Sequence, residues 1–71
     1  MNIQILVDGV PLLHDFTPID ALFPRINGVE HLFSSLNVAE KDEFILFEIA
    51  GNVEYIIRPD QKLTFEFKPG A

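Results

Sequence analysis

Short alternating runs of apolar and polar residues, separated by tight-turn dipeptides, constrain the fold of this chain more than any other feature. Residues 2–8 carry Ile or Val at every second position, which is the period of a half-buried strand. The Asp8-Gly9 dipeptide follows, and Asp-Gly is the strongest short-range signal for a two-residue hairpin turn. The sequence therefore predicts a first hairpin, in which residues 2–8 pair with a return strand over residues 10–16.

A second hairpin and a last strand are expected in the C-terminal half. Residues 44–50 form a nearly continuous apolar run, and residues 53–58 form a second one. The Gly51-Asn52 dipeptide between them suits another tight turn. Residues 62–68 then alternate between apolar and polar at every position, as an amphipathic strand does.

One helix is expected between the two halves of the sheet. Residues 17–20 begin like a helix, with a capping hydroxyl and a Pro at the first helical position, but Pro24 interrupts them. Apolar residues recur at helical spacing further on, at Val29, Leu32, Phe33 and Leu36. The sequence predicts a main helix over residues 28–37. It therefore predicts an α+β fold, a ββαβββ mixed sheet packed on one helix, in a single domain over residues 1–71. The predicted core contains Ile3, Ile5, Val7, Leu12, Leu32, Phe33, Leu36, Leu63, Phe65 and Phe67.

Charge and composition exclude several classes of partner. The chain has a formal net charge of −6 with only five Lys and Arg residues, so we expect neither nucleic acid, which needs phosphate neutralisation, nor an anionic membrane surface. The apolar runs are far shorter than the roughly 20 residues that span a bilayer. The absence of cysteine and of a signal-peptide pattern predicts a cytoplasmic protein.

The sequence offers no constellation for catalysis. His14 and His31 are the two histidines, and neither has a nucleophile at a defined spacing. A metal site that both would share is a less common arrangement than two ordinary histidines. There is no Gly-rich phosphate loop and no metal-binding motif. We therefore expect a protein that is not an enzyme and needs no cofactor or metal.

Both faces of the second hairpin are apolar, whereas one short helix covers a single face of a sheet. An uncovered apolar face of this kind marks a surface for a protein partner or a homodimer, unless the loop over residues 17–27 folds onto it. We expect Leu6 and Leu13 to belong to this surface, together with one of two sets of residues. With a turn at Gly51-Asn52, the first set is Leu46, Tyr55 and Ile57, and the second set is Phe47, Ile49 and Ile56.

Several stretches resemble ubiquitin-like β-grasp proteins. The opening Met-Asn-Ile-Gln-Ile at residues 1–5 resembles the first strand of ubiquitin, and Lys-Leu-Thr-Phe-Glu-Phe-Lys-Pro-Gly at residues 62–70 resembles its last strand and glycine tail. The middle of the chain is similar to bacterial multi-ubiquitin-type domains at residues 32–38, 44–47, 54–57 and 59–60. The resemblance covers nearly the whole chain by pattern and little of it by identity.

This resemblance implies a protein that acts by being bound. Family members are activated at a C-terminal glycine and carried by E1- and E2-like enzymes, or they dock unconjugated. The residue for conjugation would be Gly70, exposed when a peptidase removes Ala71 from a flexible tail at residues 69–71. The chain has Pro-Gly-Ala there in place of the family's double glycine. Two other functions stay open, namely a small acidic inhibitor, phage-encoded or antitoxin-like, that blocks a host protein, and a homo-oligomeric structural protein.

Overall fold

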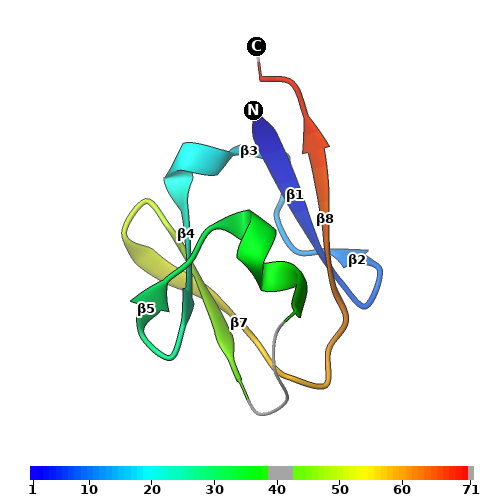
Figure 1. Ribbon diagram of the computed structural model, residues 1–71. Coiled ribbons are helices and arrows are strands. Elements are labelled where there is room, and N and C mark those ends of the chain that lie inside the picture. The colour runs from blue at the N-terminus through cyan, green and yellow to red at the C-terminus, as the bar shows by residue number, and fades with distance from the viewer. Residues whose placement is uncertain (39–42, 71) are drawn as a thin grey trace.

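The computed structural model describes residues 1–38 and 43–70, and within them the chain forms two four-stranded antiparallel sheets (Figure 1). The first sheet consists of β1 (Asn2–Val7), β2 (Val10–Pro11), β3 (Thr17–Pro18) and β8 (Leu63–Lys68). The second sheet consists of β4 (Leu22–Ile26), β5 (Val29–Glu30), β6 (Ile45–Ile49) and β7 (Asn52–Ile57). Two short 3-10 turns, η1 (Ile19–Ala21) and η2 (Phe33–Val38), complete the described elements.

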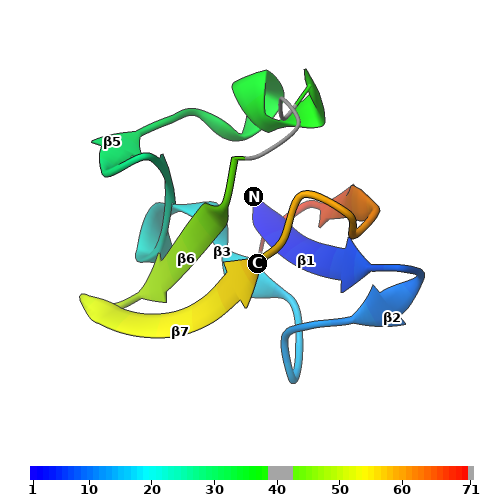
Figure 2. The ribbon, with the colours of Figure 1, turned by 90° about the horizontal axis from the view of Figure 1, so that it is seen from below.

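Strand β1 is the centre of the first sheet. Along one side it pairs with the whole of β8, from Asn2 opposite Lys68 to Val7 opposite Leu63. Its other side is shared by the two-residue strands β2 and β3. The second sheet has the order β5-β4-β6-β7. Seen from below, β6 and β7 of the second sheet lie on one side and β1 and β2 of the first on the other, with η2 at the top between them (Figure 2).

Three hairpins turn on two residues that both have positive φ. These pairs are Asp8-Gly9 (53° and 81°), Asn27-Gly28 (52° and 79°) and Ala50-Gly51 (52° and 85°). Positive φ at both central positions defines the type I′ turn, whose twist matches that of the flanking strands. The Asp8-Gly9 prediction is confirmed. The third turn lies one residue earlier than the predicted Gly51-Asn52 turn, so the pairing of β6 with β7 differs from the expected one.

The predicted α+β fold with a helix over residues 28–37 is wrong. Asn27-Gly28 closes the hairpin between β4 and β5 instead of starting a helix, and η2, six residues of 3-10 helix, is the longest helical segment among the described residues. Leu32, expected on the buried face of the helix, is 77% exposed. The helical spacing of four apolar residues was therefore outweighed by a two-residue turn signal that fixes the backbone locally.

Pro24 also has a different role from the one expected of it. It lies within β4, where its carbonyl accepts a hydrogen bond from His31 N at 3.0 Å. The N and C=O of one strand residue point to the same side, so the missing N–H of Pro24 also faces the β5 side. Pairing with β5 is therefore confined to Arg25 and Ile26, and the beginning of β4 has no strand on that side.

The core lies between the two sheets and is closed at one end by η2. Its buried apolar residues are Ile3, Ile5, Leu13, Leu22, Ile26, Phe33, Leu36, Ile45, Phe47 and Ile57. Three aromatic rings hold its centre, with Phe33 stacked on Phe47 at 6.1 Å and Phe65 edge-on to both, at 5.4 and 6.4 Å. The prediction was right for Ile3, Ile5, Phe33 and Leu36. It was wrong for Leu32 and for Phe67, which is 50% exposed, whereas Val7, Leu12, Leu63 and Phe65 pack at the edge of the core.

One buried polar side chain joins the first hairpin to the loop that follows it. Gln4, 7% exposed, donates from Nε2 to Leu13 O at 3.0 Å. Its Oε1 accepts from Leu13 N at 3.0 Å and from Ile5 N at 2.9 Å. The amide therefore supplies Leu13 with the donor and the acceptor that a neighbouring strand would otherwise provide, and this lets the apolar side chain of Leu13 be buried.

We predict that Gln4→Met destabilises the protein by about 2–4 kcal/mol, because the buried N–H and C=O of Leu13 lose their partners. The matched control is Gln61→Met, since Gln61 accepts a single hydrogen bond, from Arg58 N, at an exposed position. The control should cost less than about 1 kcal/mol. Urea unfolding of both variants measures the difference, and equal losses would contradict this role for Gln4.

We predict that Ala50→Gly stabilises the protein by about 1 kcal/mol, because Ala50 has a φ of 52° and Gly adopts this conformation without a Cβ clash. A turn at Gly51-Asn52 would place Ala50 in a strand, where Gly would destabilise by roughly 0.5–1 kcal/mol. The control is Ala21→Gly, since Ala21 is not among the residues with positive φ. The sign of the change in Tm at position 50 therefore tests the register of the turn.

Candidate functional site

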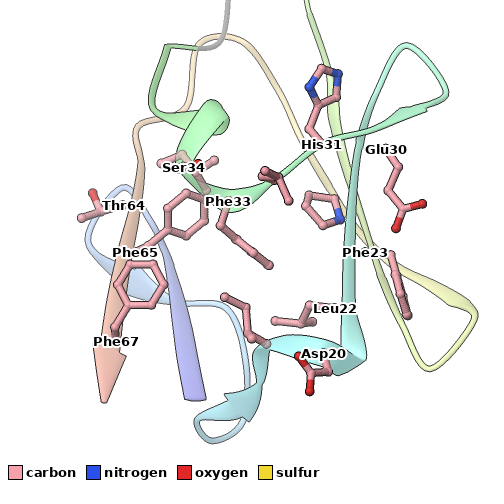
Figure 3. A pocket seen from close by; sticks show the side chains of 14 residues that line it. Asp20, Leu22, Phe23, Glu30, His31, Phe33, Ser34, Thr64, Phe65 and Phe67 are labelled. Atoms are coloured by element: carbon pink, nitrogen blue, oxygen red, sulfur yellow. The ribbon is translucent and has the colours of Figure 1, made fainter. Parts of the chain in front are cut away.

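An apolar groove with a volume of about 840 Å³ lies between β8 and the beginning of β4. Leu63, Thr64, Phe65 and Phe67 line it from β8, and Leu22, Phe23 and Pro24 line it from β4. The segment over residues 30–34 closes one end, and Ile19 and Asp20 of η1 close the other. Figure 3 shows Phe65 and Phe67 on one side, Leu22 on the other, Ser34 above and Asp20 below.

The groove exists because strand pairing stops early on both sides of it. On the β4 side, β5 ends at Glu30, and the chain leaves the sheet after the His31–Pro24 hydrogen bond. On the other side, β8 pairs with β1 and with no second strand among the described residues. Phe33 at the start of η2 reaches across and packs edge-on against Phe65, while Phe67 continues the aromatic row at 6.5 Å from Phe65. The groove is therefore an opening between two sheet edges that η2 covers in part.

The hydrogen bond between Asp8 and Lys62 shows which backbone groups of β8 face the groove side. Asp8 N donates to Lys62 O at 2.8 Å, so the backbone of every second residue from Lys62 onward points at β1. The N–H and C=O groups of Leu63, Phe65 and Phe67 therefore point away from β1. The part of the chain that the structure describes contains no strand on that side of β8, and these three residues form a free edge.

The facing edge of β4 has fewer free groups. Leu22 N–H already donates to Ile19 O in η1. Pro24 has no N–H, and its carbonyl already accepts from His31. Of the two edges that border the groove, β8 is consequently the one with a complete set of donors and acceptors.

Charged groups at the groove are acidic. Asp20 lies at the η1 end and Glu30 beside β4, and no Lys or Arg is found among the described residues that line the groove. The nearby cation Arg25 is engaged with Glu48 at 3.4 Å. Lys68, at the end of β8, lies over the ring of Phe16 at 4.4 Å. A ligand in this groove therefore meets apolar walls and uncompensated negative charge.

The residues predicted for partner binding are divided by the structure, and none of them lines the groove. Leu13, Phe47 and Ile57 belong to the buried core. Leu6, Leu46, Ile49 and Tyr55 are half-buried. Ile56 is 60% exposed. Neither predicted set forms a single face, because Leu46 pairs with Ile56, and Phe47 pairs with Tyr55.

A second apolar surface remains on the outer side of the second sheet. We call Leu46, Val53 and Ile56 the outer patch. Leu46 and Ile56 are cross-strand partners, and Val53 is paired with Glu48, two residues along β6 from Leu46, so the three share one face. Val53 is 58% exposed. The sequence prediction included Leu46 and Ile56 of this patch, whereas it placed the groove residues Phe65 and Phe67 in the core.

The tail and the histidines complete the predicted sites. Gly70 lies beside the N-terminus, where an added Cβ would come within 3.3 Å of Met1 N and 3.4 Å of the Asn2 Oδ1 atom. Ala71, and with it the end of the predicted tail, falls outside the described residues. His31 lines the groove, and His14 does not. In the described ranges, no three His, Cys, Asp or Glu residues are grouped so that they could hold a metal ion.

None of the helices in the described ranges is long and apolar enough to cross a membrane. Comparisons with protein-family models, with curated proteins and with solved structures give no match.

We predict an alternating pattern of amide hydrogen exchange along β8. Thr64 and Glu66 should exchange slowly because their N–H groups face β1, whereas Leu63, Phe65 and Phe67 should exchange fast because theirs face the groove side. Residue-resolved exchange measured by NMR tests this. Uniform protection over residues 63–67, or the reverse alternation, would show that β8 has no free edge on that side.

Proposed function

We propose that this protein is a non-enzymatic interaction module and that the groove between β8 and β4 holds a segment of a protein partner. The observation that carries the proposal is the groove itself. Its volume of about 840 Å³ lies within the roughly 300–1,000 Å³ typical of ligand sites. A chain of 71 residues has few large apolar residues to spare from its core, so an apolar surface left open is costly unless it binds something.

The exposure of two groove residues supports a macromolecular ligand. Leu32 is 77% exposed and Phe67 is 50% exposed at the opening. Covering such side chains gains about 25 cal/mol for each Å² of apolar surface removed from water. The acidic groups at Asp20 and Glu30 favour a partner segment that carries Lys or Arg.

The ubiquitin-like modifier function stays a prediction. The β-grasp fold that the resemblance implied is not the fold described above, so the proposal does not depend on it. Conjugation at Gly70 would require this residue to leave its position beside Met1 and Asn2. An acidic inhibitor would use the same groove on a basic target, and a homo-oligomer would bury the outer patch of Leu46, Val53 and Ile56 instead.

Paired surface substitutions distinguish the groove from the outer patch. Ten-residue peptides are first selected from a random library on the unaltered protein, and their affinities are then measured for two double variants. Leu32→Asp with Phe67→Asp should weaken binding at least about tenfold, through lost apolar burial at the groove. Val53→Asp with Ile56→Asp is the matched control, since these residues have comparable exposure on the outer patch, and it should leave affinity within about threefold.

Urea unfolding of both double variants checks that each remains folded. The proposal fails if the library yields no binder, or if the outer-patch variant loses affinity while the groove variant keeps it.

A further inference from the structure

We infer that the partner segment binds as an added β-strand, antiparallel to β8, with apolar side chains at alternate positions and a Lys or Arg at its N-terminal end. This inference rests on the proposed function, because it specifies how the groove is filled. It follows from the free edge of β8, from the boundary that β4 sets, and from the placement of the acidic groups.

The free edge of β8 has no proline within Leu63–Lys68 and no register shift, two of the features that normally prevent strand addition. Edge strands are commonly protected by bulges, prolines, extreme shortness or inward-pointing charges. Strand β8 is six residues long and pairs with β1 in one uninterrupted register. The edge strand β7 of the second sheet differs, because its pairing shifts register between Phe47 and Glu48, and the shift falls opposite the exposed Glu54. Of these two edges, β8 is therefore the one suited to accept a strand.

The alternation of β8 dictates the alternation of its ligand. Leu63, Phe65 and Phe67 present both their side chains and their free backbone groups toward the groove side. Residues hydrogen-bonded across an antiparallel pair have side chains on the same face of the sheet. The ligand residues that bond to these three therefore point into the groove and should be apolar. The residues between them face solvent opposite Thr64 and Glu66.

The far wall favours a single strand over a second folded copy of this chain. Strand β4 bounds the groove through Leu22 and Pro24. The space beside β8 for an added strand is therefore limited by β4 on its far side. The β8 of a second copy would bring its own β1 along its other edge. An isolated extended segment has no such neighbouring strand. It also forms no hydrogen bonds with Pro24 on its other side, because Pro24 has no N–H and its carbonyl is already bonded to His31.

Charge sets the direction and the flanking residues. Along β8, Thr64 lies toward the end of the groove that η2 closes, and Phe67 lies toward the end where Asp20 is found, across the groove from it (Figure 3). An antiparallel ligand therefore starts at the Asp20 end, where a Lys or Arg before its first apolar residue meets the carboxylate. A Lys after that residue lies opposite Glu66, as a favourable cross-strand pair. Antiparallel pairing is also slightly more stable per residue than parallel pairing.

The test uses a defined probe, acetyl-Arg-Val-Lys-Val-Thr-Val-Ser-amide, and two N-methylated versions of it. Methyl groups on the three Val nitrogens block the N–H groups that face β8, and methyl groups on the Lys and Thr nitrogens block those that face β4. The first version should lose at least about tenfold in affinity, since three hydrogen bonds are lost. The second version should bind within about threefold of the unmodified probe. On binding the unmodified probe, the amides of Leu63, Phe65 and Phe67 should become protected from exchange.

A pair of protein variants tests the same hydrogen bonds by altering β8 instead of the probe. Phe67→Pro removes the outward N–H of β8, whereas Phe67→Ala loses the same ring and keeps that N–H. The Pro variant should bind the probe at least about tenfold more weakly than the Ala variant. The hydrogen bonds to β1 come from neighbouring residues, so exchange of the Thr64 and Glu66 amides should remain slow in both variants.

Equal binding of the two N-methylated probes, or of the Pro and Ala variants, would overturn strand addition while leaving the groove as the binding site. Failure of the unmodified probe to protect the three amides would also overturn it. A doubled mass of the free protein that Phe67→Pro abolishes would assign the β8 edge to a second copy instead. Loss of the proposed function is recognised separately, because selected peptides would then be insensitive to the Leu32 and Phe67 substitutions.

Discussion

The pairing of the first long strand with the last one is the interaction on which the rest of this structure depends. Strands β2 and β3 contribute two residues each, so β8 is the only full-length neighbour of β1 among the described residues. Lys62 extends the ladder by two hydrogen bonds to Asp8, one to its backbone N–H and one from Lys62 N to the Asp8 Oδ1 atom at 2.9 Å. The turn residue Asp8 therefore serves two purposes, because it adopts the positive φ of the hairpin and fixes the start of β8.

The groove is a direct result of how the second sheet is attached to this pair. The chain crosses from the first sheet to the second between β3 and β4, through η1, and returns to the first sheet between β7 and β8. Segment η2 follows β5 and precedes β6, so it lies between two strands of the second sheet. Neither crossing brings a strand next to β8. The aromatic cluster of Phe33, Phe47 and Phe65 fills the space behind the opening, so the missing strand leaves a lined groove and not a gap in the core. A fold with a long helix in this place would have covered the same surface.

The sequence predicted the strands β1, β6, β7 and β8, but it missed β3, β4 and β5 and the assembly of two sheets. Alternation in residues 2–8 and 62–68 was enough to place β1 and β8, and the turn at Asp8-Gly9 was read correctly because Asp-Gly has a strong intrinsic preference. The prediction of a helix over residues 28–37 was wrong because four apolar residues at helical spacing are also compatible with a short strand followed by a 3-10 turn. The Asn27-Gly28 dipeptide carried the signal that could have decided between them.

The candidate site was harder to predict than the fold, for a reason that concerns register. The pairing of β6 with β7 shifts register between Phe47 and Glu48, and this irregularity places Tyr55, Ile56 and Ile57 on the opposite face from the expected one. Ile57, which was grouped with Leu46, therefore lies in the core. Burial of Gln4 could not be predicted either, because its partner atoms belong to Leu13 in a loop. The alternation of β8 was enough to assign Phe65 and Phe67 to an apolar face. It could not show that they line a groove, since the groove depends on the position of β4.

The closeness of Met1 to Gly70 has a consequence for how the chain acquires this structure. The second sheet is built from hairpins whose partners are near in sequence, so its turns can form early and at small entropic cost. The first sheet cannot be completed until the two ends of the chain meet, which makes its contacts non-local and its formation slow. During synthesis the second edge of β1 must therefore stay unpaired until β8 is made, after the whole of the second sheet.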